Sequence, residues 1–310
     1  MRAASFDELR MSGRVNQLRP FDRRNPALLD CPRGLSATMC EFCSKYGHRN
    51  RWYLNPENFS DELLRDKGRQ KIIDQVVGWG VDYYIGRSSR LVPLAKMPLL
   101  GGLAKAYVNR TTPTQHAGQI VPLEDALKMV DLARDFVALP CMCRRLVGGR
   151  ADMTCLNFGP IKELTANRRP EEPMEELPPK EVKARLRQFD KMGYVHQVAY
   201  AKLPYPIVIC NCDRKYCTLL KFRFLYDLEI ACLKGHDICM VDQVRCDGCS
   251  GKPECVRFCQ FGALRRVPTD GTVVCEPRNC FGCGVCRQSC PRGALRLIPR
   301  ESLAAVREVW

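Results

Sequence analysis

Near its C-terminus the chain carries four cysteines separated by two, two and three residues, in the stretch CFGCGVCRQSCPRGAL (residues 280–295). Three thiolates spaced in this way along a loop can curl around one cubane iron–sulfur core. A fourth, carried into a following helix, points away from that core. This spacing is typical of 4Fe-4S sites in which the fourth cysteine serves the other cluster of a pair. The stretch therefore predicts a second half of the site elsewhere in the chain.

The second half lies just upstream, in CDGCSGKPECVRFCQFGAL (residues 246–264). Aligning the two stretches places Cys255 on Cys286 and Cys259 on Cys290, both at an offset of 31 residues. The match continues through Gly-Ala-Leu in both copies, which indicates an internal duplication. The first copy has three extra residues before Cys255, but the order of its cysteines is the same.

With these motifs, roughly residues 237–299 resemble the bacterial-type dicluster ferredoxins. The resemblance implies a small pseudo-symmetric βαββαβ fold built around two 4Fe-4S clusters. It also implies two crossed sets of ligands: Cys246, Cys249, Cys255 and Cys290 for one cluster, and Cys280, Cys283, Cys286 and Cys259 for the other.

Zinc and disulfides are the alternatives for so many cysteines. Zinc sites commonly use two C-x2-C pairs split by a dozen or more residues, whereas here a third and a fourth cysteine follow each pair closely. The start of the chain, MRAASFDELRMSGRVNQLRP, lacks the apolar segment of a signal peptide. Twenty cysteines without export indicate metal ligation in a reducing compartment, so we expect a cytoplasmic protein.

A second set of six cysteines lies upstream, in CMCRRLVGGRADMTC and CNCDRKYC. On extended backbone, residues i and i+2 share a face, so each C-x-C pair can present two thiolates in one direction. We expect a third iron–sulfur cluster with four ligands from this set; zinc, a larger cluster or packed thiols are the alternatives. The six are Cys141, Cys143, Cys155, Cys210, Cys212 and Cys217.

The motifs PCMCR, TCLNFG and GYVHQV leading into ICNC also resemble the upstream domain of a group of bacterial and archaeal ferredoxin-containing proteins. The resemblance implies that these cysteines bind metal. This sequence has fewer cysteines in its CNC segment than is typical of the group, which leaves the ligand set open.

Weaker candidates complete the inventory. Cys31, Cys40, Cys43 and His48 could form a zinc or cluster site with three cysteines and one histidine. For Cys232, Cys239 and Cys275 we expect packing roles, and for His116, His196 and His236 structural roles.

The predicted fold class is α+β. We expect an extended basic arm over 1–60, a helical or loop docking segment over 61–114, a cysteine-rich α+β domain over 115–236, the dicluster domain over 237–300 and a tail over 301–310. Within the α+β domain, periodicity predicts helices over 121–136 and 181–192, the second ending at Gly193. The Pro- and Glu-rich stretch 167–180 is predicted to be a linker or surface loop, and two apolar runs, GYVHQVAYA and YPIVICNC, are predicted to be paired strands.

The charge of +15 falls to about +11 if two clusters with their thiolates each contribute about −2. A basic protein suits an acidic redox partner, an anionic membrane face or nucleic acid. The segment 91–108 is too interrupted by Pro, Gly and Lys to span a membrane, but it could form a peripheral membrane contact or a partner-docking loop. Helix 181–192 and the strands after it loosely resemble a winged helix, yet no aromatic-basic signature is present, so we disfavour nucleic acid.

Cubane clusters with four cysteine ligands favour one-electron transfer. Arg257, Arg287 and Arg292 would then raise the reduction potential of the clusters. The alternative is that they simply lie on solvent-exposed helix faces. No dinucleotide-binding glycine motif, P-loop or Ser-His-Asp arrangement is evident. Flavin chemistry would therefore need a partner, and we expect a fixed subunit of a hetero-oligomeric redox complex containing a flavoprotein or another oxidoreductase subunit. A catalytic subunit is the alternative.

Overall fold

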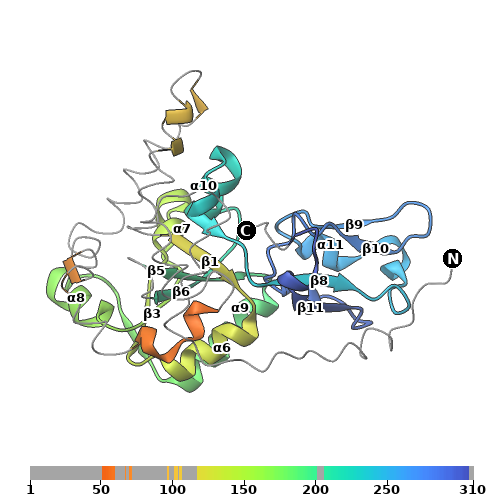
Figure 1. Cartoon of the computed structure of the whole chain (residues 1–310). Coiled ribbons are helices and arrows are strands. Elements are labelled where there is room, and N and C mark those ends of the chain that lie inside the picture. The colour runs from red at the N-terminus through yellow and green to blue at the C-terminus, as the bar shows by residue number, and fades with distance from the viewer. Residues whose placement is uncertain are drawn as a thin grey trace, which may run out of the picture.

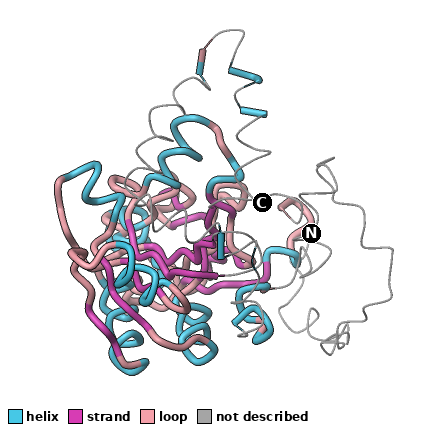
Figure 2. The backbone as a smooth tube through the Cα atoms, turned by 90° about the vertical axis from the view of Figure 1, so that its left-hand side faces the viewer, coloured by secondary structure: helices cyan, strands magenta, loops and turns pink. Residues whose placement is uncertain are grey.

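The computed structural model describes residues 51–59, 117–200 and 206–306, with a few isolated stretches of one to three residues between 67 and 106. Its strands form one seven-stranded sheet and two two-stranded sheets, accompanied by helices (Figure 1). This architecture confirms the α+β class. Figure 2 shows the strands gathered centrally, with helices around them.

The large sheet has the order β4-β2-β3-β6-β5-β1-β7. All neighbouring strands are antiparallel except β1 and β7, which are parallel. The predicted pairing of the two apolar runs is confirmed by β5 and β6, which lie at the centre of the sheet. The strands are β1 (Ala117–Val121), β2 (Phe136–Leu139), β3 (Cys155–Asn157), β4 (Glu175–Leu177), β5 (Val195–Tyr200), β6 (Pro206–Cys212) and β7 (Cys232–Leu233).

Helices cover both faces of this sheet. On one face, α6 (Leu123–Leu132) and α9 (Pro179–Lys191) pack a core that includes Met129 and Leu186. The opposite face is covered by α7 (Met142–Gly148), α8 (Ile161–Arg168) and α10 (Thr218–Tyr226). Because side chains alternate along a strand, residues of β5 and β6 reach both layers.

Two boundaries in this part differ from the sequence-based prediction. The helix expected over 121–136 is limited to α6, because the apolar residues at its two ends, Val121 and Phe136, belong to strands. The expected linker 167–180 instead contains β4, which pairs with β2, and the start of α9. By contrast, Gly193 follows α9 with a φ of +82°, as expected of a helix stop.

The C-terminal unit repeats one motif twice. Strand β8 (Asp237–Val241) is followed by α11 (Glu254–Phe258) and β9 (Leu264–Arg266), and β10 (Val273–Cys275) is followed by the 3-10 turn η8 (Val285–Arg287) and β11 (Leu295–Pro299). The first strand pairs antiparallel with the last, and the two middle strands pair with each other. Further 3-10 turns are η7 (Gly248–Gly251) and η9 (Arg300–Ser302).

The C-terminal unit shares an apolar cluster with the large sheet. Ile120 and Leu219 from the sheet domain pack in this cluster with Phe261, Phe281 and Val285 from the C-terminal unit. The rings of Phe261 and Phe281 stack with centroids 4.2 Å apart. Beside the cluster, Arg287 forms a two-pronged ion pair with Glu124 at the start of α6. The boundary expected at residue 236 thus coincides with a tightly packed interface.

The last residues of the expected N-terminal arm belong to the core. Trp52 and Tyr53, in the 3-10 turn η2 (Trp52–Leu54), are buried against α6 and the sheet, and η3 (Pro56–Phe59) follows. Arg51 bonds to Asp125 and, at 2.8 Å, to Asp237. The remainder of the arm and most of the docking segment lie outside the described residues. No helix in the described ranges is long and apolar enough to cross a membrane.

Candidate iron–sulfur centres

One small cavity of the C-terminal unit is lined by the four cysteines that the duplication pairs across its two halves. Three of them, Cys280, Cys283 and Cys286, come from the second motif, and Cys259 comes from the end of the first. Phe258, Phe261 and Phe281 complete the wall. The structure therefore brings together the set expected for one cluster, in apolar surroundings.

The other expected set also gathers in one place. The Cys249 thiol interacts electrostatically with those of Cys290 and Cys246. Cys255 lies close to Cys286, Cys290 and Cys249, and burial raises its pKa to about 12. Cys290 is thus beside the first motif, although it belongs to the second in sequence. Both fourth cysteines lie with the opposite half.

Backbone N–H groups donate to sulfur in a pattern that obeys the same two-fold relation. Ala263 N–H donates to Cys259 Sγ at 3.2 Å, and Ala294 N–H donates to Cys290 Sγ at 3.4 Å. Across the two halves, Cys239 N–H donates to Cys280 Sγ at 3.3 Å.

The hydrogen bond from Cys239 N–H to Cys280 Sγ has a counterpart in the other half. There Val273 N–H donates to Cys246 Sγ at 3.4 Å. Each donor lies seven residues before the first cysteine of its own half (239 to 246, and 273 to 280) and bonds the first cysteine of the other half. Donation to sulfur stabilises the thiolate form, which is the form that binds metal.

Cys239 and Cys275 lie against the thiols of the set that contains Cys280, Cys283 and Cys286. Both line the same cavity, and Cys239 Sγ is 3.7 Å from Cys286 Sγ. Hydrogen bonds from the thiols of Cys239 and Cys280 lower the pKa of Cys275 to about 4. The packing role expected of these two is therefore incomplete, because their thiols contact candidate ligands. Cys232, in contrast, is fully buried in β7 and lines neither cavity.

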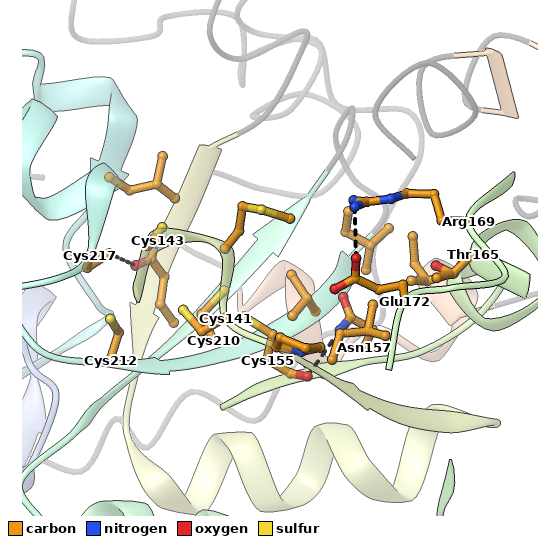
Figure 3. A pocket seen from close by; sticks show the side chains of 18 residues that line it. Cys141, Cys143, Cys155, Asn157, Thr165, Arg169, Glu172, Cys210, Cys212 and Cys217 are labelled. Atoms are coloured by element: carbon orange, nitrogen blue, oxygen red, sulfur yellow. Dashed lines mark hydrogen bonds and ion pairs between the residues drawn. The ribbon is translucent and has the colours of Figure 1, made fainter. Parts of the chain in front are cut away.

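All six upstream cysteines line a single cavity beneath α7 and α10, shown in Figure 3. This cavity encloses about 120 Å³, several times what one water molecule needs. Most of its wall is apolar, including Leu139, Ile161, Val208 and Leu219. Figure 3 places Cys217, Cys143 and Cys212 towards one end and Asn157, Glu172 and Arg169 towards the other.

Local structure explains how two distant segments reach this cavity. Cys210 and Cys212 share one face of β6, and Cys155 lies directly opposite Cys210 on β3. After β6, the Asp213 carboxylate accepts hydrogen bonds from the N–H groups of Lys215 and Tyr216. This Asx turn delivers Cys217 to the N-cap of α10.

The other C-x-C pair differs from the expectation of extended backbone. Cys141 is the N-cap of α7, and Cys143 lies in the first turn of that helix. Cys141 itself keeps extended backbone, with a ψ of 113°, and the turn into the helix brings the two thiols within hydrogen-bonding contact. The two residues still point into the same cavity (Figure 3).

Four of the six thiols form a closed ring of contacts. The Cys141 thiol contacts those of Cys143 and Cys212, and both of these contact Cys217. Hydrogen bonds from Cys143, Cys155 and Cys212 lower the pKa of Cys141, which favours its thiolate. We call Cys141, Cys143, Cys212 and Cys217 the thiol ring; Cys155 and Cys210 lie beside it.

Two polar residues near the thiol ring were not singled out from the sequence. The guanidinium of Arg144 is buried between the rings of Tyr194 and Tyr216, at 4.6 and 4.9 Å, and it bonds to Asp213 at 2.7 Å. Gln197 lines the cavity, and its buried Nε2 has no partner among the described residues. The adjacency of Arg144 to Cys143 in CMCRR was the only available signal.

Whether these residues fit metal depends on the kind of metal site. Among the described residues, no group of three or more Cys, His, Asp or Glu side chains is arranged to hold a metal ion. In a 4Fe-4S cluster each thiolate binds a different iron, so the ligands surround a core and do not converge on one ion. Sets of four cysteines with N–H donors at sulfur fit that requirement. Cys31, Cys40, Cys43 and His48 lie outside the described residues.

The expected structural histidines are both buried where the structure describes them. His196 bonds to Asn211 at 2.7 Å, and His236 lies 3.3 Å from the side-chain nitrogen of Gln119; His116 lies outside the described residues.

No family model, curated protein or solved structure matches this chain.

Proposed function

We propose that this chain is an iron–sulfur electron-transfer protein whose C-terminal unit has the dicluster ferredoxin fold. The observation that carries the proposal is the two-fold pattern of N–H donors at the sulfur atoms. A duplicated cysteine motif could serve other purposes, but matching donors to Cys246 and Cys280, and to Cys259 and Cys290, suit thiolates that share negative charge with a cluster.

In this proposal the C-terminal unit holds two 4Fe-4S clusters. Cys246, Cys249, Cys255 and Cys290 bind the first, and Cys280, Cys283, Cys286 and Cys259 bind the second. The clusters supply reversible one-electron storage when bound. The protein holds the ligands in apolar surroundings, and Arg287 and Arg292 place positive charge nearby, each paired with one carboxylate.

The thiol ring is proposed to hold a third cluster. It offers four thiols that line one largely apolar cavity, three of them buried, and the guanidinium of Arg144, paired with Asp213 and Asp152, lies beside it. The side chain of Gln197 also reaches the thiol ring, since its Oε1 accepts from Cys217 Sγ at 3.8 Å, while its buried Nε2 has no partner among the described residues. A Cβ at Gly118 would lie 1.8 Å from this atom, so glycine is needed there for Gln197 to adopt its position.

The three sites would form a linear relay. Cys212 and Cys217 of the thiol ring belong to the same apolar cluster as Phe261 and Phe281, and Cys259 and Cys283 of the second site pack against it. The second site therefore lies next to both of the others, since Cys255 of the first site is near enough to Cys286 for the two thiols to interact electrostatically. Electrons would pass from the first site through the second to the thiol ring, or in reverse.

We further propose a subunit of a larger redox complex, in a reducing cytoplasmic compartment, with a flavoprotein or other oxidoreductase subunit as the partner. The alternative of a winged helix for nucleic acid loses support, because β5 and β6 are buried central strands of the large sheet and cannot act as an exposed wing.

Quantification of iron and acid-labile sulfide in anaerobically purified full-length protein tests the proposal. We expect about twelve iron atoms per chain with three clusters and about eight with two. Four or fewer would contradict the two-cluster C-terminal unit. Zinc in place of iron, without acid-labile sulfide, would contradict electron transfer altogether.

A further inference from the structure

The cavity holds two thiols more than the thiol ring needs. Cys155 and Cys210 are direct cross-strand neighbours on β3 and β6. Backbone bonds join Asn211 to Thr154 on one side of them and Phe158 to Ile207 on the other. Since bonded and non-bonded pairs alternate along an antiparallel ladder, Cys155 and Cys210 occupy a non-bonded position, where Cα atoms are about 4.5 Å apart.

That position suits a disulfide. Disulfides need Cα atoms roughly 4.4–6.8 Å apart, and the two thiols are already in hydrogen-bonding contact. Both are free thiols in this structure and both are partly exposed, whereas three members of the thiol ring are buried. Cys155 also contacts Cys141, so this pair is connected to the thiol ring.

The remaining cavity wall offers room and polarity for a small molecule. Beyond Cys155 the wall continues to Asn157, Thr165 and the paired Arg169 and Glu172 (Figure 3). The thiols are recessed between apolar side chains, so a low-molecular-weight compound reaches them more readily than a folded protein does.

We propose that Cys155 and Cys210 form a dithiol/disulfide couple that reduces small organic disulfides bound in this cavity. The inference rests on the proposed electron-transfer function, which supplies the reducing electrons. It assigns the two surplus cysteines a redox role of their own and does not make them further ligands.

The chemistry balances as thiol–disulfide exchange. One thiolate of the pair attacks a substrate sulfur, the substrate S–S bond breaks, and the first thiol product leaves. The second cysteine attacks the mixed disulfide, which releases the second thiol product and leaves a Cys155–Cys210 disulfide. Two electrons and two protons restore both thiols; the electrons come singly from a low-potential ferredoxin- or flavin-type donor through the cysteine-bound centres.

The test uses full-length protein purified anaerobically, with dithionite-reduced methyl viologen as donor and hydroxyethyl disulfide as probe. We expect Cys155→Ser and Cys210→Ser each to lose probe reduction while keeping the wild-type iron content and cluster signals. Cys212→Ser, within the thiol ring, should lose about four iron atoms. Cys232→Ala is the matched control, because this buried cysteine of the same sheet lines neither cavity, and it should retain both iron and reduction.

A second readout is independent of activity. Peptide mapping after mild oxidation should find a Cys155–Cys210 disulfide in the wild type. Loss of iron from either serine variant would overturn the proposal, because the residue would then be a cluster ligand. Reduction of hydroxyethyl disulfide at the wild-type rate in both serine variants would also overturn it. If the protein reduced protein disulfides but not hydroxyethyl disulfide, the proposal that its substrates are small organic disulfides would be wrong.

Failure of the proposed function looks different. Wild-type protein that contains no iron would contradict the electron-transfer proposal. Peptide mapping of the same oxidised protein would still decide on the dithiol/disulfide couple: a Cys155–Cys210 disulfide would support it, and its absence would overturn it.

Discussion

At the residue scale, the position of each fourth cysteine would decide which of the two proposed clusters it serves. Cys290 lies with Cys249 and Cys255, whereas Cys259 lines the cavity of Cys280, Cys283 and Cys286. The spacing predicts this exchange because a thiol carried onto the following turn cannot point back at its own loop.

The first prediction follows from that exchange. Cys290→Ala should remove the cluster held by Cys246, Cys249 and Cys255, with loss of about four iron atoms, and should spare the adjacent site. Cys259→Ala is the mirror control. A redox titration followed by electron paramagnetic resonance distinguishes the two, and loss of the sequence-adjacent site instead would contradict the crossed assignment.

Arg144 carries the second prediction. Its buried charge should stabilise the more negative, reduced state of a cluster in the thiol ring. Arg144→Gln should lower that potential by some tens of millivolts, on the order of 1 kcal/mol, because Asp213 and Asp152 already offset part of the Arg144 charge.

Arg144→Lys is the matched control for this prediction. It should recover most of the potential, because charge is restored, while losing the stacking between Tyr194 and Tyr216. A redox titration of the third signal measures both variants. Equal potentials in wild type and Arg144→Gln would show that Arg144 only holds α7 to Asp213.

At the element scale, a glycine in each cysteine loop allows the two halves to approach. Gly248 lies between Cys246 and Cys249 with a φ of +65°, and a Cβ there would be 1.9 Å from the Gly271 carbonyl oxygen. Gly282 occupies the equivalent place with a φ of +72°, 2.1 Å from the Asp237 carbonyl oxygen. Each loop therefore packs against backbone of the other half.

The third prediction is that Gly248→Ala selectively loses the first cluster and Gly282→Ala the second. Both backbone strain and a collision oppose the new methyl group, so each loop must open. Gly262→Ala and Gly293→Ala are the controls, because their φ values are also positive but nothing lies within 4 Å of the added atom. They should cost only about 1–3 kcal/mol of strain and keep all iron. Equal iron loss in all four variants would contradict a role for the collision.

How far the sequence predicts these elements depends on how local their cause is. The run around β5, the helix α9 and the stop at Gly193 follow from residue periodicity and are found in place. The predicted ends of helix α6 are wrong, because Val121 and Phe136 fit the apolar stripe of a helix but pair with strands of the large sheet. β4 was missed because a three-residue strand rich in Glu is stabilised only by pairing with β2.

The candidate site divides in the same way. The resemblance implies two crossed groups for the eight C-terminal cysteines, and the structure places the thiols in those groups; that they bind clusters stays a prediction. Which of the six upstream thiols meet cannot be read from spacing, because the contact of Cys155 with Cys210 is a matter of strand register. Gln197 gave no signal, as its neighbours in space come from β1, β6 and the N-cap of α10.

At the scale of the whole molecule, the segment 51–59 joins the N-terminal region to both parts of the fold. Trp52 and Tyr53 are buried with 1% and 0% exposure, and Trp52 donates from its indole to Gln119 at 2.6 Å. Arg51 bonds both Asp125 of α6 and Asp237 of β8. Any boundary for a docking arm therefore lies before Arg51, not at residue 60.

The last prediction uses this boundary to test the subunit proposal. A chain lacking residues 1–50 should keep its iron and thermal stability, because the packed segment remains. A chain lacking 1–59 should be strongly destabilised, since truncating one buried Trp alone costs about 3–5 kcal/mol. Trp52→Ala in the full-length chain isolates that packing effect from the loss of residues 1–50.

Partner capture then reports on residues 1–50 alone. Anaerobic pull-down with the full-length chain should recover a stoichiometric flavoprotein or other redox subunit, and the chain lacking 1–50 should lose it while its clusters still accept electrons from methyl viologen. Full-length Trp52→Ala should retain the partner if it still folds. If full-length protein and the 1–50 deletion both run as monomers, recover no stoichiometric partner and reduce ferredoxin acceptors equally fast, then the chain is a diffusing carrier, and its basic N-terminal residues do not dock it to a complex.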